Sequence, residues 1–140
     1  MSERQSNGER RTLLDELIRD EGIRLRLYQD TVGKWTIGCG RNLTDRGISQ
    51  REAMDLLDHD VDECMTDLAG SFPWFVLLDS VRQRVLINKR FQLGATGLRG
   101  FRRLLRFLEQ GDYDRAASEM RASRWARQVP KRAGRLMRMM

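Results

Sequence analysis

The sequence predicts an α+β fold that is mostly helical and has one small antiparallel sheet near its amino end. Apolar residues recur at helical spacing over most of the chain, for example between Ala53 and Leu68. Residues 24–40 instead alternate apolar and polar side chains, as strands do. The chain has 140 residues, of which 40% are hydrophobic and 33% charged. It is therefore long enough for one compact domain built as two lobes around a cleft.

The amino-terminal segment combines a polar leader with a short helix. Residues 1–11 are polar and charged, and we expect them to precede a single domain at 12–140. Thr12 is a candidate N-cap and Gly22 a candidate helix end. Glu21 is therefore expected at the carboxyl end of a helix. The apolar positions of this helix are Leu13, Leu14, Leu17 and Ile18.

The next segment changes period and predicts a β-hairpin. Leu25 and Leu27 alternate with arginines, and a turn containing Gly33 follows at residues 29–34. Alternation then resumes, and we expect the bulky side chains of one face to pack inward, namely Trp35, Ile37 and Cys39. The opposite face has open backbone that a sugar can approach, because its residues are Thr36, Gly38 and Gly40.

The rest of the chain predicts helices that begin and end at recognisable signals. Ser49 and Glu52 form a capping box at the start of the longest helix, at about 50–69, which ends near Gly70 and Pro73. The next helix is capped by Asp79 and runs until Gly94. Short helices complete the chain, at about 101–109, after Asp112, after Ser123 and from Pro130.

Basic residues are concentrated in the last third of the chain. The whole chain has a net charge of +6, and from Arg99 to Met140 there are 12 lysines and arginines against 4 aspartates and glutamates. Such a surface attracts polyanions, which include nucleic acid, anionic lipid and the phosphate-bearing polymers of a bacterial envelope. No stretch approaches the roughly 18 apolar residues that span a bilayer, and we expect no signal peptide.

Elimination narrows the chemistry that the chain can perform. His59 is the only histidine, and its position among helical acidic residues is typical of a solvated surface histidine. Cys39 and Cys64 lie 25 positions apart and are expected to be free thiols. No zinc-ligand set remains, so we expect neither a metal nor a cofactor. Carboxylate chemistry is left.

Two acids in different surroundings are the candidates for that chemistry. The partial negative charge at a helix carboxyl end disfavours an ionised carboxylate, so we expect Glu21 to act as a general acid. Asp30 lies in a polar turn and is expected to stay ionised. Cleavage of a glycosidic bond needs this inequality, since one group protonates the leaving oxygen while the other activates water or attacks the anomeric carbon.

Residues 20–40, with the sequence DEGIRLRLYQDTVGKWTIGCG, resemble the active-site segment of the tailed-phage lysozymes. The resemblance continues at residues 86–94, 96–101 and 123–130. It implies a two-lobe fold with a hairpin lobe at about 22–48, a connecting helix at about 50–69, and a helical lobe at about 72–140 that includes the first helix. It further implies a muramidase that cuts the β-1,4 bond between N-acetylmuramic acid and N-acetylglucosamine with inversion.

The resemblance also assigns site residues. Glu21 matches the catalytic acid, Asp30 the second carboxylate, and Thr36 the cleft threonine near the attacking water. Phe91 and Gln92 match residues that line the substrate cleft from the larger lobe. The remaining candidates for substrate binding are Asn42, Gly38 and Glu119.

Several positions depart from the family pattern. The stretch after Gly40 is shorter than in the coliphage enzymes, so part of their sheet is expected to be missing. Arg41 stands where those enzymes have a histidine, and Leu104 and Glu119 stand where they have polar contacts to glycan. Lys89 lies on an apolar helix face where the family is apolar, and we expect it either to extend to the surface or to find an acidic partner.

The resemblance also implies an endolysin that acts as a monomer on peptidoglycan. It would stay in the host cytoplasm until a holin-type pore releases it to the wall. Two alternatives remain open. The segment from Pro130 could make the chain a cationic membrane-active protein, and the basic third could bind nucleic acid, although no recognition-helix motif is present and we expect no nucleic-acid partner.

Overall fold

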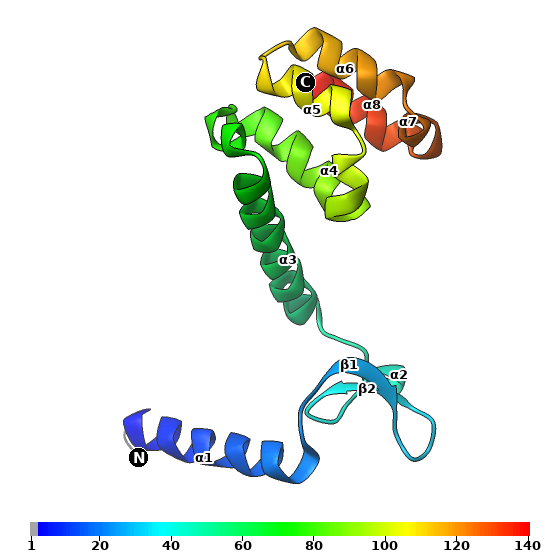
Figure 1. Ribbon diagram of the computed structural model, residues 1–140. Helices are drawn as coiled ribbons and strands as arrows, with labels where there is room; N and C mark the ends of the chain where they lie inside the picture. The colour runs from blue at the N-terminus through cyan, green and yellow to red at the C-terminus, as the bar shows by residue number, and fades with distance from the viewer. Residues whose placement is uncertain (1–2) are drawn as a thin grey trace. The chain divides into compact units, whose positions relative to one another are not determined.

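The computed structural model describes the backbone of residues 3–140 and the side chains from Ser6 onward. The chain divides into two compact units, one ending at Ala53 and one beginning at Met54 (Figure 1). It is mostly helical with one three-stranded antiparallel sheet, which confirms the predicted α+β class. Among the described residues, no helix is long and apolar enough to cross a membrane.

The first unit begins with a helix that is longer than predicted. Helix α1 covers Glu3–Glu21, so the leader predicted at residues 1–11 is helical from Glu3, while Met1 and Ser2 lie outside the described residues. Thr12 does not cap the helix as expected, because its hydroxyl donates to the carbonyl of Gly8, one turn earlier, at 3.0 Å. Glutamate, arginine and glutamine have good helix propensity even where they form no apolar stripe.

The sheet of the first unit confirms the hairpin and adds a strand to it. Strands β1 (Arg24–Gln29) and β2 (Trp35–Gly38) pair antiparallel, and β3 (Arg41–Asn42) pairs with the other edge of β2. Thr36 therefore lies in the central strand, opposite Tyr28 on one side and Asn42 on the other. A short helix follows, α2 (Leu43–Arg46), which the sequence analysis did not predict.

The longest helix begins where its capping box predicted. Helix α3 covers Gln50–Ser71. The hydroxyl of Ser49 accepts from the amide of Glu52 at 3.1 Å, and the carboxylate of Glu52 accepts from the amide of Ser49 at 2.9 Å. Each group thus satisfies a backbone donor that the helix start leaves unpaired. A 3₁₀ helix, η1 (Pro73–Leu77), follows.

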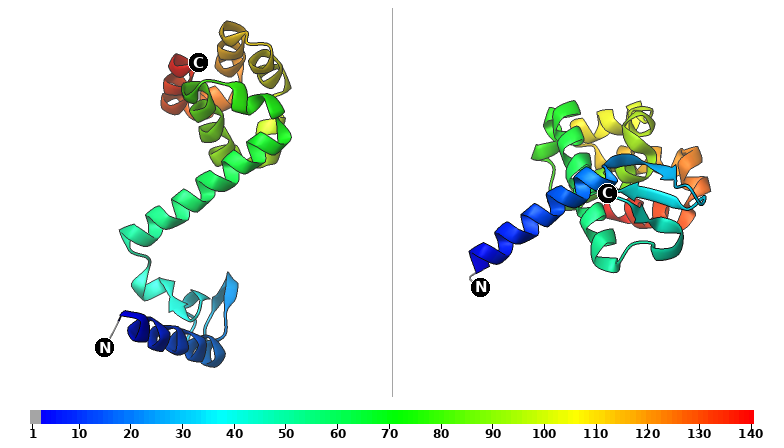
Figure 2. Two further views of the ribbon diagram at one scale, coloured as in Figure 1. Left: turned by 90° about the vertical axis from the view of Figure 1, so that its left-hand side faces the viewer. Right: turned by 90° about the horizontal axis from the view of Figure 1, so that it is seen from below.

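The second unit is a cluster of helices, in which α8 packs against α4 and α6, and α5 packs against α6 (Figure 2). After η1 comes α4 (Ser80–Arg99), which is capped by Asp79 as predicted and interrupted at Gly94, whose φ of 76° is not helical. The shorter helices also begin near their predicted signals: α5 (Arg102–Glu109), α6 (Tyr113–Ala122), α7 (Arg124–Gln128) and α8 (Pro130–Met139).

The core of the second unit contains a lysine. Lys89 is completely buried, and its Nζ lies 3.4 Å from the ring centroid of Trp125 and 3.9 Å from that of Phe101. This amine has no hydrogen-bond partner in the described part of the chain. Burial lowers the pKa of Lys89 from 10.5 to about 7. The expectation that Lys89 reaches the surface or an acid is therefore wrong, because the rings of Phe101, just before α5, and of Trp125 in α7 enclose it.

The residue beside Lys89 behaves in the ordinary way. Arg90 reaches back to α3, where its Nε lies 2.8 Å from a carboxylate oxygen of Asp67. This contact lowers the pKa of Asp67 and raises that of Arg90. The two neighbouring cations of α4 are thus accommodated differently, one by a carboxylate and one by aromatic rings.

Candidate active site

Glu21 is fixed at the point where α1 ends. Gly22 follows it with a φ of 74°, and the amide of Gly22 donates to the carbonyl of Ile18 at 2.7 Å. This positive φ is the conformation with which many helices stop, and glycine adopts it without strain. The helix end therefore sets the direction in which the Glu21 side chain leaves the backbone.

The turn between β2 and β3 lies directly against this carboxylate. A Cβ atom at Gly40 would be 3.2 Å from Oε2 of Glu21, which is closer than most side-chain carbons approach. Gly40 also has a φ of 72°. The turn is attached to α1 by the thiol of Cys39, which donates to the carbonyl of Leu17 at 3.4 Å. The backbone conformation therefore favours glycine at position 40, and a larger side chain there would have to displace the Glu21 carboxylate slightly.

Glu21 lines a hollow of about 560 Å³ in the first unit. Gly38 and Gly40 form one side of this hollow, and leucine and isoleucine side chains of α1 form the other. Glu21 carries the only carboxyl group of this lining. An open, mainly apolar wall with one acid is suited to receive the face of a sugar ring and to protonate an oxygen attached to it.

Asp30 follows β1 and organises the turn that leads to β2. Its Oδ1 accepts from the amide of Val32 at 3.0 Å and from the amide of Lys34 at 2.8 Å. These bonds fix the plane of the carboxylate. Among the described residues, Oδ2 has no hydrogen-bond partner, so it is available to a water molecule or a hydroxyl group of a ligand.

Thr36 is connected to the same turn. Its hydroxyl donates to the carbonyl of Lys34 at 2.9 Å, while the amide of Lys34 is the donor to Asp30. The amide of Asp30 also donates to the carbonyl of Lys34 at 2.9 Å. The structure therefore brings Asp30 and Thr36 together through the backbone of one residue.

The two faces of β2 are not arranged as expected. Thr36 is only 4% exposed, whereas Trp35, which was expected to pack inward, is 46% exposed. The reason is the third strand, because β3 makes β2 central and leaves Thr36 between two neighbouring strands. The amide of Trp35 donates to the hydroxyl of Thr44 in α2 at 2.8 Å, which fixes the backbone but does not bury the indole.

Asn42 and Arg41 have structural partners within the first unit. The side chain of Asn42 caps α2, since its Oδ1 accepts from the amide of Asp45 at 3.0 Å. Arg41 forms an ion pair with Glu52 at the start of α3, with 2.7 Å between Nη2 and Oε2. The hydrogen bond from Arg41, and then those from Ser49, lower the pKa of Glu52 to about 2. Contact of Asn42 with substrate stays a prediction.

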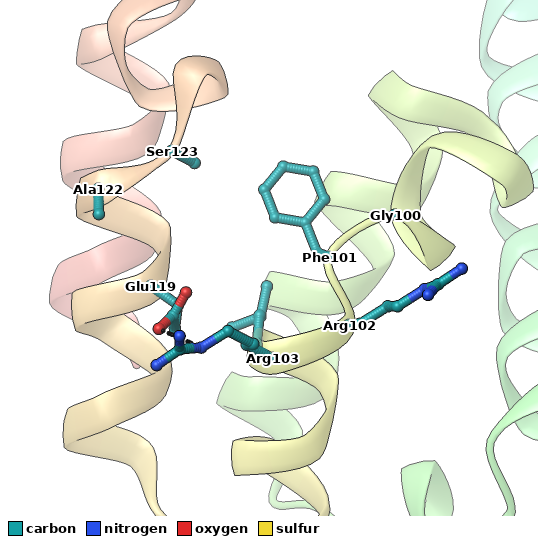
Figure 3. Close-up of a pocket in the computed structure, with 8 residues that line it drawn as sticks. Gly100, Phe101, Arg102, Arg103, Glu119, Ala122 and Ser123 are labelled. Atoms are coloured by element: carbon teal, nitrogen blue, oxygen red, sulfur yellow. Dashed lines mark ion pairs between the residues drawn. The ribbon is translucent and has the colours of Figure 1, made fainter.

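The other candidate residues belong to the second unit. Phe91 is 45% exposed and lines a hollow with Leu57 and Ile87. The Oε1 of Gln92 accepts a hydrogen bond from the indole of Trp125 at 2.9 Å, and this bond fixes the orientation of the Gln92 amide. Glu119 is paired with Arg103 at 3.0 Å, in another hollow of the same unit (Figure 3). Their roles as substrate contacts stay predictions.

A comparison with protein families decides the assignment, because the phage lysozyme family matches residues 19–138. The chain belongs to the phage lysozyme family. This phage lysozyme is 29% identical to "Probable T4-type lysozyme 2" of Dictyostelium discoideum, over 90% of this chain and 91% of that protein. "Probable T4-type lysozyme 1" of the same organism is 26% identical over the same shares.

A further relative of the phage lysozyme is much larger than it. The "Pre-baseplate central spike protein Gp5" of Enterobacteria phage T4 is 29% identical, over 89% of this chain but only 27% of that protein. The family and these relatives establish the chain as a glycoside hydrolase of the lysozyme type. The resemblance drawn from residues 20–40 is thereby confirmed.

Lys34 of this phage lysozyme holds two of the candidate residues and was not predicted from the sequence. Its peptide groups hold both Asp30 and Thr36. A signal for it was present, since aspartate at the start of a tight turn that contains glycine commonly accepts hydrogen bonds from backbone amides a few residues later. The ion pair of its side chain with Asp45, at 3.2 Å, depends on α2 and had no local signal.

Proposed function

We propose that this phage lysozyme hydrolyses the β-1,4 bonds between N-acetylmuramic acid and N-acetylglucosamine in peptidoglycan, with inversion at the anomeric carbon. The observation that carries the proposal is the placement of Glu21, an acid held against the backbone of Gly40 in an otherwise apolar hollow. Asp30 and Thr36 supply a second polar site, held through Lys34 in the turn between β1 and β2.

Each of these groups has one role in the proposed reaction. Glu21 gives its proton to the glycosidic oxygen as the bond to the anomeric carbon breaks. A water molecule attacks the same carbon, and Asp30 accepts its proton through the free Oδ2. Thr36 donates its own hydrogen to Lys34, so its oxygen still has lone pairs with which to accept a hydrogen bond from that water.

The proposed substrate contacts are Gly38 and Asn42 in the first unit, and Phe91, Gln92 and Glu119 in the second. Gln92 has the strongest support, because the hydrogen bond from Trp125 fixes its carbonyl oxygen and leaves its amide nitrogen free to donate. An amide that is already held by a hydrogen bond within the protein loses less side-chain entropy on binding a sugar than a freely rotating amide does.

Digestion of purified peptidoglycan tests the reaction. New reducing ends are labelled by borohydride reduction and identified by mass spectrometry, and the anomer first released is read by proton NMR. We expect N-acetylmuramic acid at the reducing end, in the inverted configuration, and no product from Glu21→Gln. Asp20→Asn is the matched control, since it removes a neighbouring exposed carboxylate of α1. Equal losses in the two variants, or a retained configuration, would contradict the proposal.

We also infer a role for the basic charge of the chain and a place of action. The net charge of +6 concentrates the enzyme on the anionic envelope, so clearing of whole cells should slow as ionic strength rises while the fold is unchanged. The enzyme accumulates in the host cytoplasm and reaches the wall through a holin-type pore. Lysis of cells that express it without a holin would contradict this, and killing by Glu21→Gln would indicate membrane action.

A further inference from the structure

We propose that the second unit carries a binding site for a phosphorylated saccharide, formed between η1 and the α4–α5 segment and separate from the catalytic acids. A hollow of about 380 Å³ lies there. Its lining combines two aromatic rings with three arginines and one acid, namely Phe72, Trp74, Arg99, Arg102, Arg106 and Glu109. The proposal goes beyond hydrolysis, since binding at this site needs no catalytic step.

Acidic side chains neutralise only part of the positive charge of the arginines in this hollow. Arg99 is held by the hydroxyl of Ser71 at 3.0 Å and lies 3.6 Å from Asp67. Arg102 and Arg106 are one turn apart on α5 and form no ion pair within residues 6–140. Like charges at this spacing destabilise a helix, and a bound anion between them would remove the repulsion.

Arg102 lines both this hollow and the neighbouring hollow that contains Glu119. In the neighbouring hollow, Arg103 is paired with Glu119, whereas the side chain of Arg102 points away from that pair (Figure 3). The guanidinium of Arg102 is therefore not engaged by Glu119. Arginine is well suited to phosphate, because its planar group can donate two parallel hydrogen bonds to phosphate oxygens.

The aromatic residues define the second half of the ligand. Phe72 and Trp74 lie with their ring centroids 5.3 Å apart at an angle of 40°, and both are partly exposed. A partly exposed aromatic pair beside cations offers an apolar surface to the carbon–hydrogen face of a sugar ring. Free phosphate would use only the arginines, and a neutral sugar only the rings, whereas a phosphorylated saccharide uses both.

Such a site would hold the enzyme on phosphate-bearing polymers of the envelope while the catalytic acids act elsewhere. This differs from the general attraction of the basic surface, which acts at long range and needs no particular arginine. The site-specific contribution depends on Arg102, Arg106 and Trp74, and it should persist at salt concentrations that screen the diffuse charge.

The test is a titration of the full chain with N-acetylglucosamine 6-phosphate, followed by NMR of the Trp74 indole. We expect a saturable shift of this signal. The double variant Arg102→Gln/Arg106→Gln should weaken binding about a hundredfold or more, since each lost charged hydrogen bond is worth at least about tenfold. Trp74→Ala should weaken it as well, while the rate of hydrolysis of purified, phosphate-free peptidoglycan stays unchanged.

Matched controls decide between this site and simple charge attraction. Arg121→Gln/Arg127→Gln removes two exposed arginines of α6 and α7 that do not line the hollow, and it should leave the affinity unchanged. Equal weakening in the two double variants would overturn the proposal. Binding of inorganic phosphate with the same affinity, or saturation without any shift at Trp74, would overturn it as well.

Discussion

Replacement of Lys89 by methionine should stabilise the protein. Each pKa unit corresponds to about 1.4 kcal/mol, so a fall in the pKa of Lys89 from 10.5 to about 7 corresponds to a penalty of about 5 kcal/mol for the protonated amine. Contacts of Nζ with the Trp125 and Phe101 rings offset about 1–2 kcal/mol of this. Methionine has a similar shape and no charge. We therefore expect Lys89→Met to raise the free energy of unfolding by about 2–3 kcal/mol at pH 7.

The pH dependence distinguishes this cause from better packing. Between pH 7 and 10.5 the unfolded chain binds a proton at Lys89 that the folded chain does not hold. The stability of the natural protein should therefore rise through this window, and below pH 7 the penalty is complete. Because the variant lacks the group, its advantage should shrink as the pH approaches 10.5.

Thermal melts of both proteins at several values from pH 6 to pH 10 measure this effect. For a chain of this length we expect the variant to melt about 5–10 °C higher at pH 7. Lys131→Met is the control, because Lys131 is exposed on α8 and its loss should change the melting temperature little. A lower melting temperature for Lys89→Met, or an advantage that does not change with pH, would refute the reasoning.

Three further predictions concern Gly40 and Glu52 in the first unit and Trp125 in the second. Gly40→Ala places a methyl group 3.2 Å from the Glu21 carboxylate, at a backbone position with a positive φ. We expect the free energy of unfolding, measured by denaturant titration, to fall by about 1 kcal/mol and hydrolysis to slow about tenfold. Hydrolysis at the wild-type rate would contradict this. The pKa of Glu52 in the folded protein, about 2, lies below its ordinary value of 4.5. Its ion pair with Arg41 therefore stabilises the fold above pH 4.5, and this stabilisation is lost as the pH falls toward 2. Glu52→Gln should make stability depend less on pH over that range, and an unchanged acid unfolding profile would count against the pair. Trp125→Phe frees Gln92 and should raise KM more than it lowers kcat, whereas a fall in kcat alone would mean that Gln92 does not position substrate.

Local signals were sufficient for most helix boundaries. Ser49 with Glu52 and Asp79 cap the helices that follow them, as predicted, because a short polar side chain bonds to amides only two or three residues away. The start of α1 was not predicted, because residues 3–11 have no apolar stripe and are helical through the helix propensity of their residues. Strand β3 was missed because two residues become a strand only through pairing with β2.

The sequence indicates candidate residues for the site but not the contacts that hold them in place. Glu21, Asp30 and Thr36 were named from their residue types and from the family resemblance. Their support comes from backbone groups of Lys34 and from the approach of Gly40, and both depend on how the sheet closes. The surroundings of Lys89 were unpredictable for a similar reason, because α4 periodicity does not show which rings arrive from later helices.

The short turn from Asp30 to Lys34 has a consequence for how the chain can vary. Surface turns usually accept added or deleted residues. Here the backbone of Lys34 holds the side chains of both Asp30 and Thr36 and so sets the distance between them. One inserted residue would displace the carboxylate and the threonine hydroxyl from each other without disturbing any packed interior. If Asp30 and Thr36 position the attacking water as proposed, the reaction sets the length of this turn, and an enzyme with a longer turn should remain folded while losing activity.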